Sequence, residues 1–508
     1  MFAGDSRRRF LQNAAAVGAV AGLGDLTFLS RLKPVSAAEA QPDAKMVQLG
    51  PDIEPVVRLL EDTPRDKLLE VVAARIHGGL SYRDLLAGLL LAGVRNVQPR
   101  PEVGFKFHAV LVVNSAHLAS ISSPDAHRWL PIFWALDEFK DAQAQDKREG
   151  DWTMRAVDES AVPTASKARA AFVDAMDTWN EGAADAAVAG LARTTGMDDV
   201  FELMFRYGAR DFRSIGHKAI FVANSMRTLN CIGHHHAEPV LRSLAYALLK
   251  HDGNNPAKGD DKADRPWRLN VERAKKIRGN WLEGKVDPAA TTEMLATLRQ
   301  ADENETADKV VELLNREIAP QAIWDALFVG AGELLVRQPG IVALHAVTST
   351  NALRYAWDTS SSDDTRRMLL LQNAAFVSMF RQAMTGRGPV KPYNLDEMQP
   401  VSLESEGPKA VEEIFTNVSG DKMKAAGKVL AYLQANPEPK ELIDAARLLI
   451  FLKGTNAHDY KFSSAVLEDY QNVSQPWRGR FLASSVFNLR GAMGPDNALV
   501  QRTRAALG

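Results

Sequence analysis

Three segments of this chain share a pattern that predicts apolar helices. Each opens on a basic residue followed by alanine, continues with apolar and small residues, contains no glycine or proline, and reaches an asparagine six positions later. Segments of this composition are typical of helices. They are 108–117 (HAVLVVNSAH), 218–227 (KAIFVANSMR) and 345–354 (HAVTSTNALR).

A fourth segment, 236–245 (HAEPVLRSLA), keeps the His-Ala opening but has Arg242 at the asparagine position. The copies are irregularly spaced, which argues against a uniform solenoid. In an α-helix, position i+7 lies about 20° from position i, so a serine or alanine shares a face with each opening residue and leaves room beside it. Position i+9 points the other way, so we do not expect His117 to share a site with His108.

Imidazoles on separate apolar helices can converge on one centre, and we take a shared metal site as the central hypothesis. The pattern selects as ligands His108, His236 and His345, with His235 as the reserve for His236 and His217 replacing Lys218 if the register shifts by one. Asn114, Asn351 and Glu238 are candidates for fixing the imidazole tautomers from a second shell. The alternative is that these histidines are hydrogen-bonded core residues.

A polar stretch near the end of the chain, 453–462 (KGTNAHDYKF), is a further candidate. His458 and Lys461 are three residues apart and share a helix face. The stretch predicts either a contribution to the site or an ordinary helix N-terminus, with Asp459 favourably placed in the helix dipole.

The whole chain predicts an all-α protein, one large multi-helix domain built from irregular, duplicated histidine-bearing helical hairpins. Residues 41–250 form an N-terminal helical half, 251–285 a polar loop or linker, and 286–508 a C-terminal helical half that shares one core with the first. We find no long alternating strand segments, and no Walker A, Rossmann, Gly-x-Ser-x-Gly, His-Glu-x-x-His or Cys-x-x-Cys motif.

The first 40 residues read as an export signal. Ser6–Gln12 (SRRRFLQ) resembles the twin-arginine consensus, a mildly apolar run follows, and Ala38-Glu39-Ala40 fits a cleavage site. The sequence therefore predicts a partner in the twin-arginine export machinery and a periplasmic or secreted protein. The apolar run is too short and weak for a good span, so we expect no stable membrane span in the mature protein.

The net charge and the cysteine count exclude several partners and kinds of site. The net charge is −2, which argues against nucleic acid as a partner. Cys231 is the single cysteine, which excludes an intramolecular disulfide, a thiolate metal site built by this chain alone, and c-type haem attachment. A site made of imidazoles without thiolates suits iron or zinc.

The His345 segment (HAVTS, then ALR), the His236-Ala-x-x-x-Leu-Arg segment and His458-x-x-Lys461 resemble motifs of the questin oxidase-like family. The resemblance covers four or five short segments. It implies a mainly helical fold, oxidative cleavage of aromatic polyketide rings, and a non-haem iron bound by several histidines, with a modified lysine. By that resemblance His108, His236 and His345 are metal ligands, Lys461 is a lysine ligand and His458 its neighbour. Lys218, and the export signal, depart from the family pattern.

These observations predict an exported metal-dependent oxidoreductase, a non-haem iron oxygenase acting on an organic, aromatic small-molecule substrate. The first alternative is a metal-dependent hydrolase or lyase that uses the same histidines with zinc. The second is a non-enzymatic helical binding or scaffold protein.

Overall fold

Apolar residues at helical spacing, with capping residues between them, account for the secondary structure of the chain. The computed structural model describes residues 46–100 and 106–507, so the predicted export signal lies outside the described residues. The described residues form 22 α-helices and no strand, which confirms the all-α prediction. None of their helices is both long enough and apolar enough to cross a membrane.

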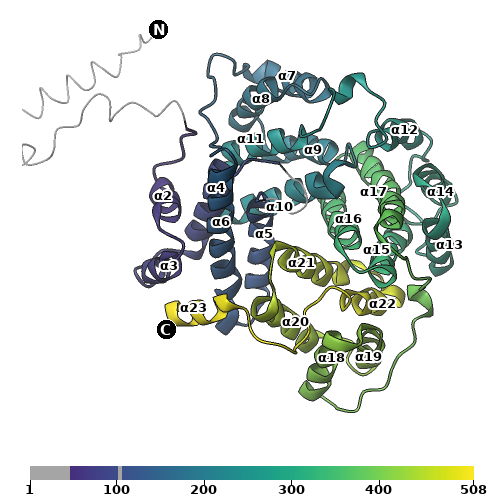
Figure 1. Ribbon diagram of the computed structural model, residues 1–508. Coiled ribbons are helices and arrows are strands. Elements are labelled where there is room, and N and C mark those ends of the chain that lie inside the picture. Colours follow the sequence, from purple (N-terminus) through teal and green to yellow (C-terminus); the bar gives the residue numbers. More distant parts are fainter. Residues whose placement is uncertain (1–45, 101–105, 508) are drawn as a thin grey trace, which may run out of the picture.

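Four helices occupy the middle of the molecule (Figure 1). They are α5 (His108–Ile121), α10 (His217–Ile232), α16 (Ile341–Thr359) and α21 (Ala457–Asn472). Each carries polar residues on faces that would otherwise be wholly apolar, and three of the four contain the repeated sequence pattern.

The remaining helices surround these four (Figure 1). On the N-terminal side are α2 (Glu54–Asp62), α3 (Leu68–His77), α4 (Tyr82–Asn96), α6 (Leu130–Glu149), α7 (Ala165–Asp177), α8 (Glu181–Thr194), α9 (Met197–Gly208) and α11 (Ala237–Leu248). Then come α12 (Arg265–Ala274), α13 (Pro288–Gln300), α14 (Glu303–Asn315), α15 (Pro320–Arg337) and α17 (Asp363–Met384). The last are α18 (Pro408–Gly420), α19 (Lys422–Ala435), α20 (Lys440–Lys453), α22 (Gln475–Ser485) and α23 (Ala498–Leu507).

Local sequence signals set many of the helix ends. The Ser81 side chain accepts a hydrogen bond from the Asp84 backbone N–H and caps α4. Pro64 follows the end of α2, so the apolar spacing from 52 to 75 yields two helices. The polar segment 251–285 contains α12, which packs against α14 and α17, so it is not a loop throughout.

The four central helices run parallel, with their N-termini at one end. Contacts between two neighbouring helices move toward higher residue numbers on both helices together. His108 meets His217 and, further on, Asn114 meets Asn224; likewise the Asn351 amide donates to Asp469, eleven residues after His458. An antiparallel pair would show one index rising as the other falls. A parallel arrangement brings four helix N-termini together, and this end of the bundle holds the histidines.

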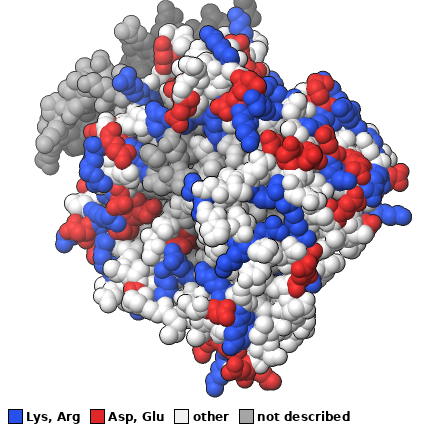
Figure 2. All heavy atoms as spheres, turned by 45° about the vertical axis from the view of Figure 1, so that its right-hand side comes forward, with Lys and Arg blue, Asp and Glu red and all other residues white. Residues whose placement is uncertain are grey.

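One continuous cluster of buried hydrophobic side chains extends from Ile53 to Val500 and includes helices from both halves of the chain. The bundle therefore sits inside a single core. On the surface, Lys and Arg are distributed among Asp and Glu over the face drawn in Figure 2.

Candidate metal centre

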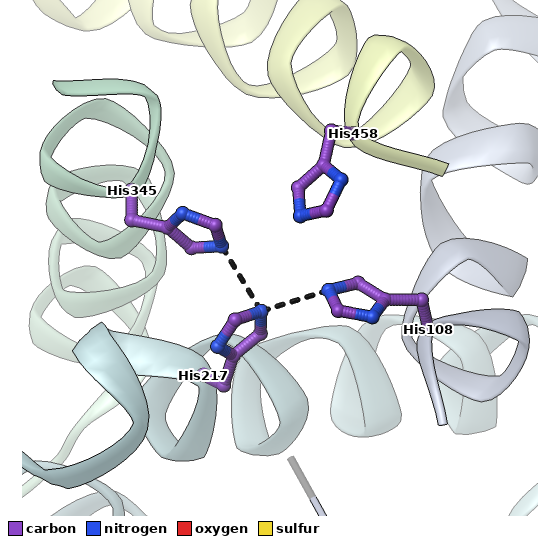
Figure 3. Close-up of side chains that lie close together, drawn as sticks. All are labelled: His108, His217, His345 and His458. Atoms are coloured by element: carbon purple, nitrogen blue, oxygen red, sulfur yellow. Dashed lines mark hydrogen bonds between the residues drawn. The ribbon is translucent and has the colours of Figure 1, made fainter. Parts of the chain in front are cut away.

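Four histidines from the four central helices point toward one another (Figure 3). They are His108, His217, His345 and His458, and one ring nitrogen of each lies within 4.8 Å of those of the other three. His217 is in the middle: its Nε2 is 2.9 Å from Nε2 of His108 and 3.0 Å from Nε2 of His345. The ring of His458 lies over the other side, with centroids 4.5 Å from His108 and 5.3 Å from His345.

A strained turn positions His217. Ser214, Ile215 and Gly216 all have positive φ, at 55°, 44° and 83°, and the first two are residues that rarely adopt this conformation. Gly216 has no room for a side chain, because a Cβ there would lie 2.6 Å from Cβ of Ser349 on α16. The turn thus presses the start of α10 against α16 and brings His217 next to His345.

Backbone carbonyls fix the protons of two of these rings. Nδ1–H of His217 donates to the Ser214 carbonyl at 2.6 Å, and Nδ1–H of His345 donates to the Ile341 carbonyl, also at 2.6 Å. In a neutral imidazole with its proton on Nδ1, Nε2 carries a lone pair. The two Nε2 atoms that face each other at 3.0 Å are therefore both acceptors, and only a cation between them relieves their repulsion.

Burial makes a metal ion a better candidate for that cation than a proton. His217 and His345 have no exposed surface. Burial, followed by the charges of Lys461 and neighbouring histidines, holds the pKa of both rings well below the usual value. Neutral imidazoles with free Nε2 atoms are the form that binds transition metals.

The spacing of the nitrogens also fits one ion. Two nitrogens bound at about 2.0–2.1 Å to one ion lie about 2.9 Å apart at a right angle and about 3.4 Å apart at a tetrahedral angle. The Nε2 separations from His217 are 2.9 and 3.0 Å. The residues present could therefore hold a metal ion, and the spacing is closest to ligands at right angles.

His458 and Lys461 bring two further donors. Nε2 of His458 and Nζ of Lys461 are buried without a hydrogen-bond partner. Burial lowers the pKa of Lys461 to about 7, and burial with the Lys461 charge lowers the pKa of His458 to about 3. Because His458 belongs to the four-histidine group and the charge of Lys461 acts on its rings, these two atoms are further candidates for metal ligands.

The helix ends add to this electrostatic setting. His108 and His217 are the first residues of α5 and α10, and His458 is the second of α21, while His345 lies in the first turns of α16. Each helix N-terminus carries a partial positive charge of about half an elementary charge. Four of them at one end of the bundle disfavour imidazolium there and favour an anionic ligand on a bound metal.

The structure places two residues of the sequence alignment elsewhere. Nζ of Lys218 forms a buried ion pair with Asp211 at 2.9 Å, so His217, one residue earlier, faces the centre. His236 lies in the 3₁₀ turn η4 (His234–His236) and forms a separate cluster with His235 and Asp52. Neither His236 nor His235 reaches the four-histidine centre, because the 3₁₀ turn precedes α11 rather than a helix of the central bundle.

The residues selected as a second shell do not contact the imidazoles through any hydrogen bond of the described chain. Asn114 donates to Asn224, and Asn351 donates to Glu468 and Asp469. Glu238 forms an ion pair with Arg193 at the surface. Carbonyls of the backbone perform the predicted task instead, and a sequence pattern cannot reveal them.

His458 was a candidate from the polar stretch 453–462 and, by the family resemblance, a neighbour of a lysine ligand; the structure places it as the fourth member of the group. Asn456 and Asp459 form a capping box around it, so the stretch is both a helix N-terminus and part of the site. The i, i+3 spacing to Lys461 was the available signal. As expected, His117 faces away: its Nδ1 lies 3.0 Å from the Tyr82 hydroxyl.

Comparison of the chain with protein-family models, curated proteins and solved structures finds no match. The resemblance to the questin oxidase-like family therefore remains a prediction from short motifs, and the arguments for function come from the geometry of the centre.

Proposed function

We propose that the protein is a metal-dependent oxidoreductase that uses a non-haem iron held by His108, His217, His345 and His458 to oxidise a small organic substrate. The observation that carries the proposal is the contact between Nε2 of His217 and Nε2 of His345, two lone-pair atoms 3.0 Å apart in a buried site. A bound iron would supply redox chemistry with dioxygen at a position that the four histidines leave open.

The chain's own residues have defined tasks in this proposal. The Ser214 and Ile341 carbonyls hold the rings of His217 and His345 in the tautomer that presents Nε2. Lys461 lies at the same end of α21, is 2% exposed, and offers a neutral amine as a fifth donor or a proton carrier. The resemblance stated above also implies a lysine at this position.

The parallel bundle has a cavity at its other end, too far from the four histidines for a ligand bound there to contact the metal. The cavity has a volume of about 620 Å³ and is lined by all four helices, with Leu118, Arg227, Tyr355 and Glu468 among its walls. Each of these residues follows its helix's histidine by ten positions, or about 15 Å along the axis. The walls combine apolar side chains with a paired charge, Arg227 to Glu468 at 2.6 Å. Such mixed walls are typical of ligand pockets.

Elemental analysis of natively exported protein, with oxygen consumption measured on aromatic substrates, tests the proposal. We expect about one iron per chain, lost in His108→Ala and retained in His117→Ala, which removes another buried histidine from the same helix. Iron that both variants retain, or metal-free wild-type protein, would overturn the assignment. Near-stoichiometric zinc without oxygen consumption would instead support the hydrolase or lyase, because zinc has no redox chemistry.

The variant Lys461→Met tests whether the Lys461 amine binds the metal or is a buried amine without a role there. If the amine acts at the metal, we expect iron affinity or oxygen consumption to fall at least tenfold, the order seen when groups around a metal are removed. If it does not, replacing an unpartnered buried amine by an apolar side chain leaves the metal in place and raises thermal stability.

A further inference from the structure

A second group of metal-binding side chains lies at the surface, away from the four-histidine centre. It consists of His235 and His236 from η4 and Asp52 from the turn before α2. One ligand atom from each residue lies within 4.8 Å of those of the other two. His236 is buried, and the side chains of His235 and Asp52 are 63% and 65% exposed.

Two glycines shape this site. Gly233 has a φ of +110°, and a Cβ at this position would lie 2.7 Å from two atoms of the His235 ring. A Cβ at Gly50 would collide with Oδ1 of Asp52. Both exposed ligands therefore fold back onto backbone that carries no side chain.

The η4 turn directs two of the three consecutive histidines toward Asp52 and the third away from it. The rings of His235 and His236 are in contact, with centroids 3.8 Å apart, and Nε2 of His235 is 3.9 Å from Oδ2 of Asp52. His234 points elsewhere, and its Nε2 lies 2.9 Å from Oδ1 of Asn230. The chain thus gathers two imidazoles beside one carboxylate and excludes the third imidazole.

We propose that Asp52, His235 and His236 form a separate, solvent-accessible site for a divalent transition metal ion such as zinc. Two imidazoles and one carboxylate are a known ligand set for zinc and for other first-row metals, and they leave coordination positions for water or another ligand. The contact of the two rings shows that His235 has to rotate by a small amount to point its nitrogen at a shared ion, which its exposure allows.

The open side of the site faces a cavity of about 580 Å³. The two histidines line it together with Glu159, Arg193 and Glu238. Arg193 pairs with both glutamates at 2.7 Å, which leaves this group of three side chains with a net charge of −1. A divalent ion bound by Asp52 and the two histidines would place positive charge beside this wall, and its free positions would accept a ligand from solvent.

Equilibrium dialysis with zinc on the full mature protein tests the site, and it does not depend on what the four-histidine centre does. We expect wild-type protein to bind one zinc that a chelator removes at once. The double variant His235→Ala/His236→Ala should lose this zinc, and Asp52→Asn should bind it at least tenfold more weakly. His234→Ala is the matched control and should bind zinc as the wild type does.

Two results would overturn the site. One is wild-type protein without rapidly exchanging zinc. The other is an equal loss of zinc in His234→Ala and in the double variant, which would show unspecific binding by a histidine-rich surface. Iron content, measured on the same samples, should stay the same in all variants, since η4 follows the C-terminal end of α10, whereas His217 begins that helix.

Discussion

The four-histidine centre and the Asp52–His235–His236 cluster place the same side chain in opposite surroundings. In the centre, four parallel helices and two backbone carbonyls hold the rings, and burial keeps them neutral. At the surface, a three-residue turn carries two of the ligands, two glycines leave room for them, and solvent reaches His235 and Asp52 but not the buried His236. The centre therefore has its donors close together without a metal, whereas we expect the surface cluster to adjust its geometry when it binds one.

The largest difference should appear when one histidine is removed from each cluster. His217 is the middle of the centre and contacts two other ligands, so we expect His217→Ala to lose all tightly bound metal. His236→Ala should keep it and lose only the exchangeable zinc. Elemental analysis before and after brief chelation measures both pools. If His236→Ala empties the tight pool, the assignment of the centre is wrong.

We expect a chelator to lower the thermal stability of the protein by removing metal from the four-histidine centre, and not by removing zinc from the surface cluster. A ligand at a thousand times its dissociation constant stabilises the folded state by about 4 kcal/mol. Prolonged treatment with a strong chelator should therefore lower the thermal unfolding temperature of wild-type protein by several degrees. The variant His235→Ala/His236→Ala should show the same shift, and His217→Ala should show none. A shift that persists in His217→Ala would place the stabilising metal elsewhere.

Lowering the pH should separate the two clusters by their proton affinity. Burial and the Lys461 charge lower the pKa of His458 to about 3, and burial holds the pKa of His217 and His345 well below the usual value, whereas the pKa of His236 in the surface cluster is lowered to a lesser extent, also by burial. Dialysis at pH 5 should remove zinc from the surface and leave metal in the centre. Simultaneous release would contradict the comparison.

The lowered pKa values of the buried histidines also predict how the stability of the metal-free protein changes with pH. Unfolded imidazoles have a pKa of about 6.5 and take up protons below it, whereas the buried ones do not. The free energy of unfolding should therefore fall as the pH drops below about 6.5, and denaturant titrations at pH 7.5 and 5.5 measure it.

The smallest effect is expected from Gly233→Ala. A non-glycine residue at φ +110° costs about 1–3 kcal/mol, and the new Cβ would displace the His235 ring. Zinc binding at the surface should weaken, with the tight metal unchanged. Gly253→Ala is the control, since Gly253 also has positive φ but a Cβ there meets nothing. Equal zinc binding by the two variants would show that the Gly233 contact does not shape the site.

Short-range sequence patterns predicted the helices well. The apolar repeats became α5, α10 and α16. These features depend on neighbours within one or two helical turns, and a single sequence contains that information. The position of His117, away from the centre, followed from helical geometry alone.

The same reasoning aligned Lys218 with His108 and His345, because the residues that follow them match. The structure differs by one residue, since the strained turn at Ser214–Gly216 rotates the start of α10 and sends Lys218 to Asp211. Helical periodicity does not report the conformation of the turn before a helix. His236 was selected for the same reason and lies in another part of the fold.

The sequence by itself determined that the chain is helical and that its histidines begin apolar helices, because periodicity and capping are local. Only the tertiary structure decided which histidines meet. The meeting of His108, His217, His345 and His458 joins segments up to 350 residues apart (458 minus 108), through the packing of four parallel helices. Such long-range packing depends on the shape of every surrounding helix, and no local pattern encodes it.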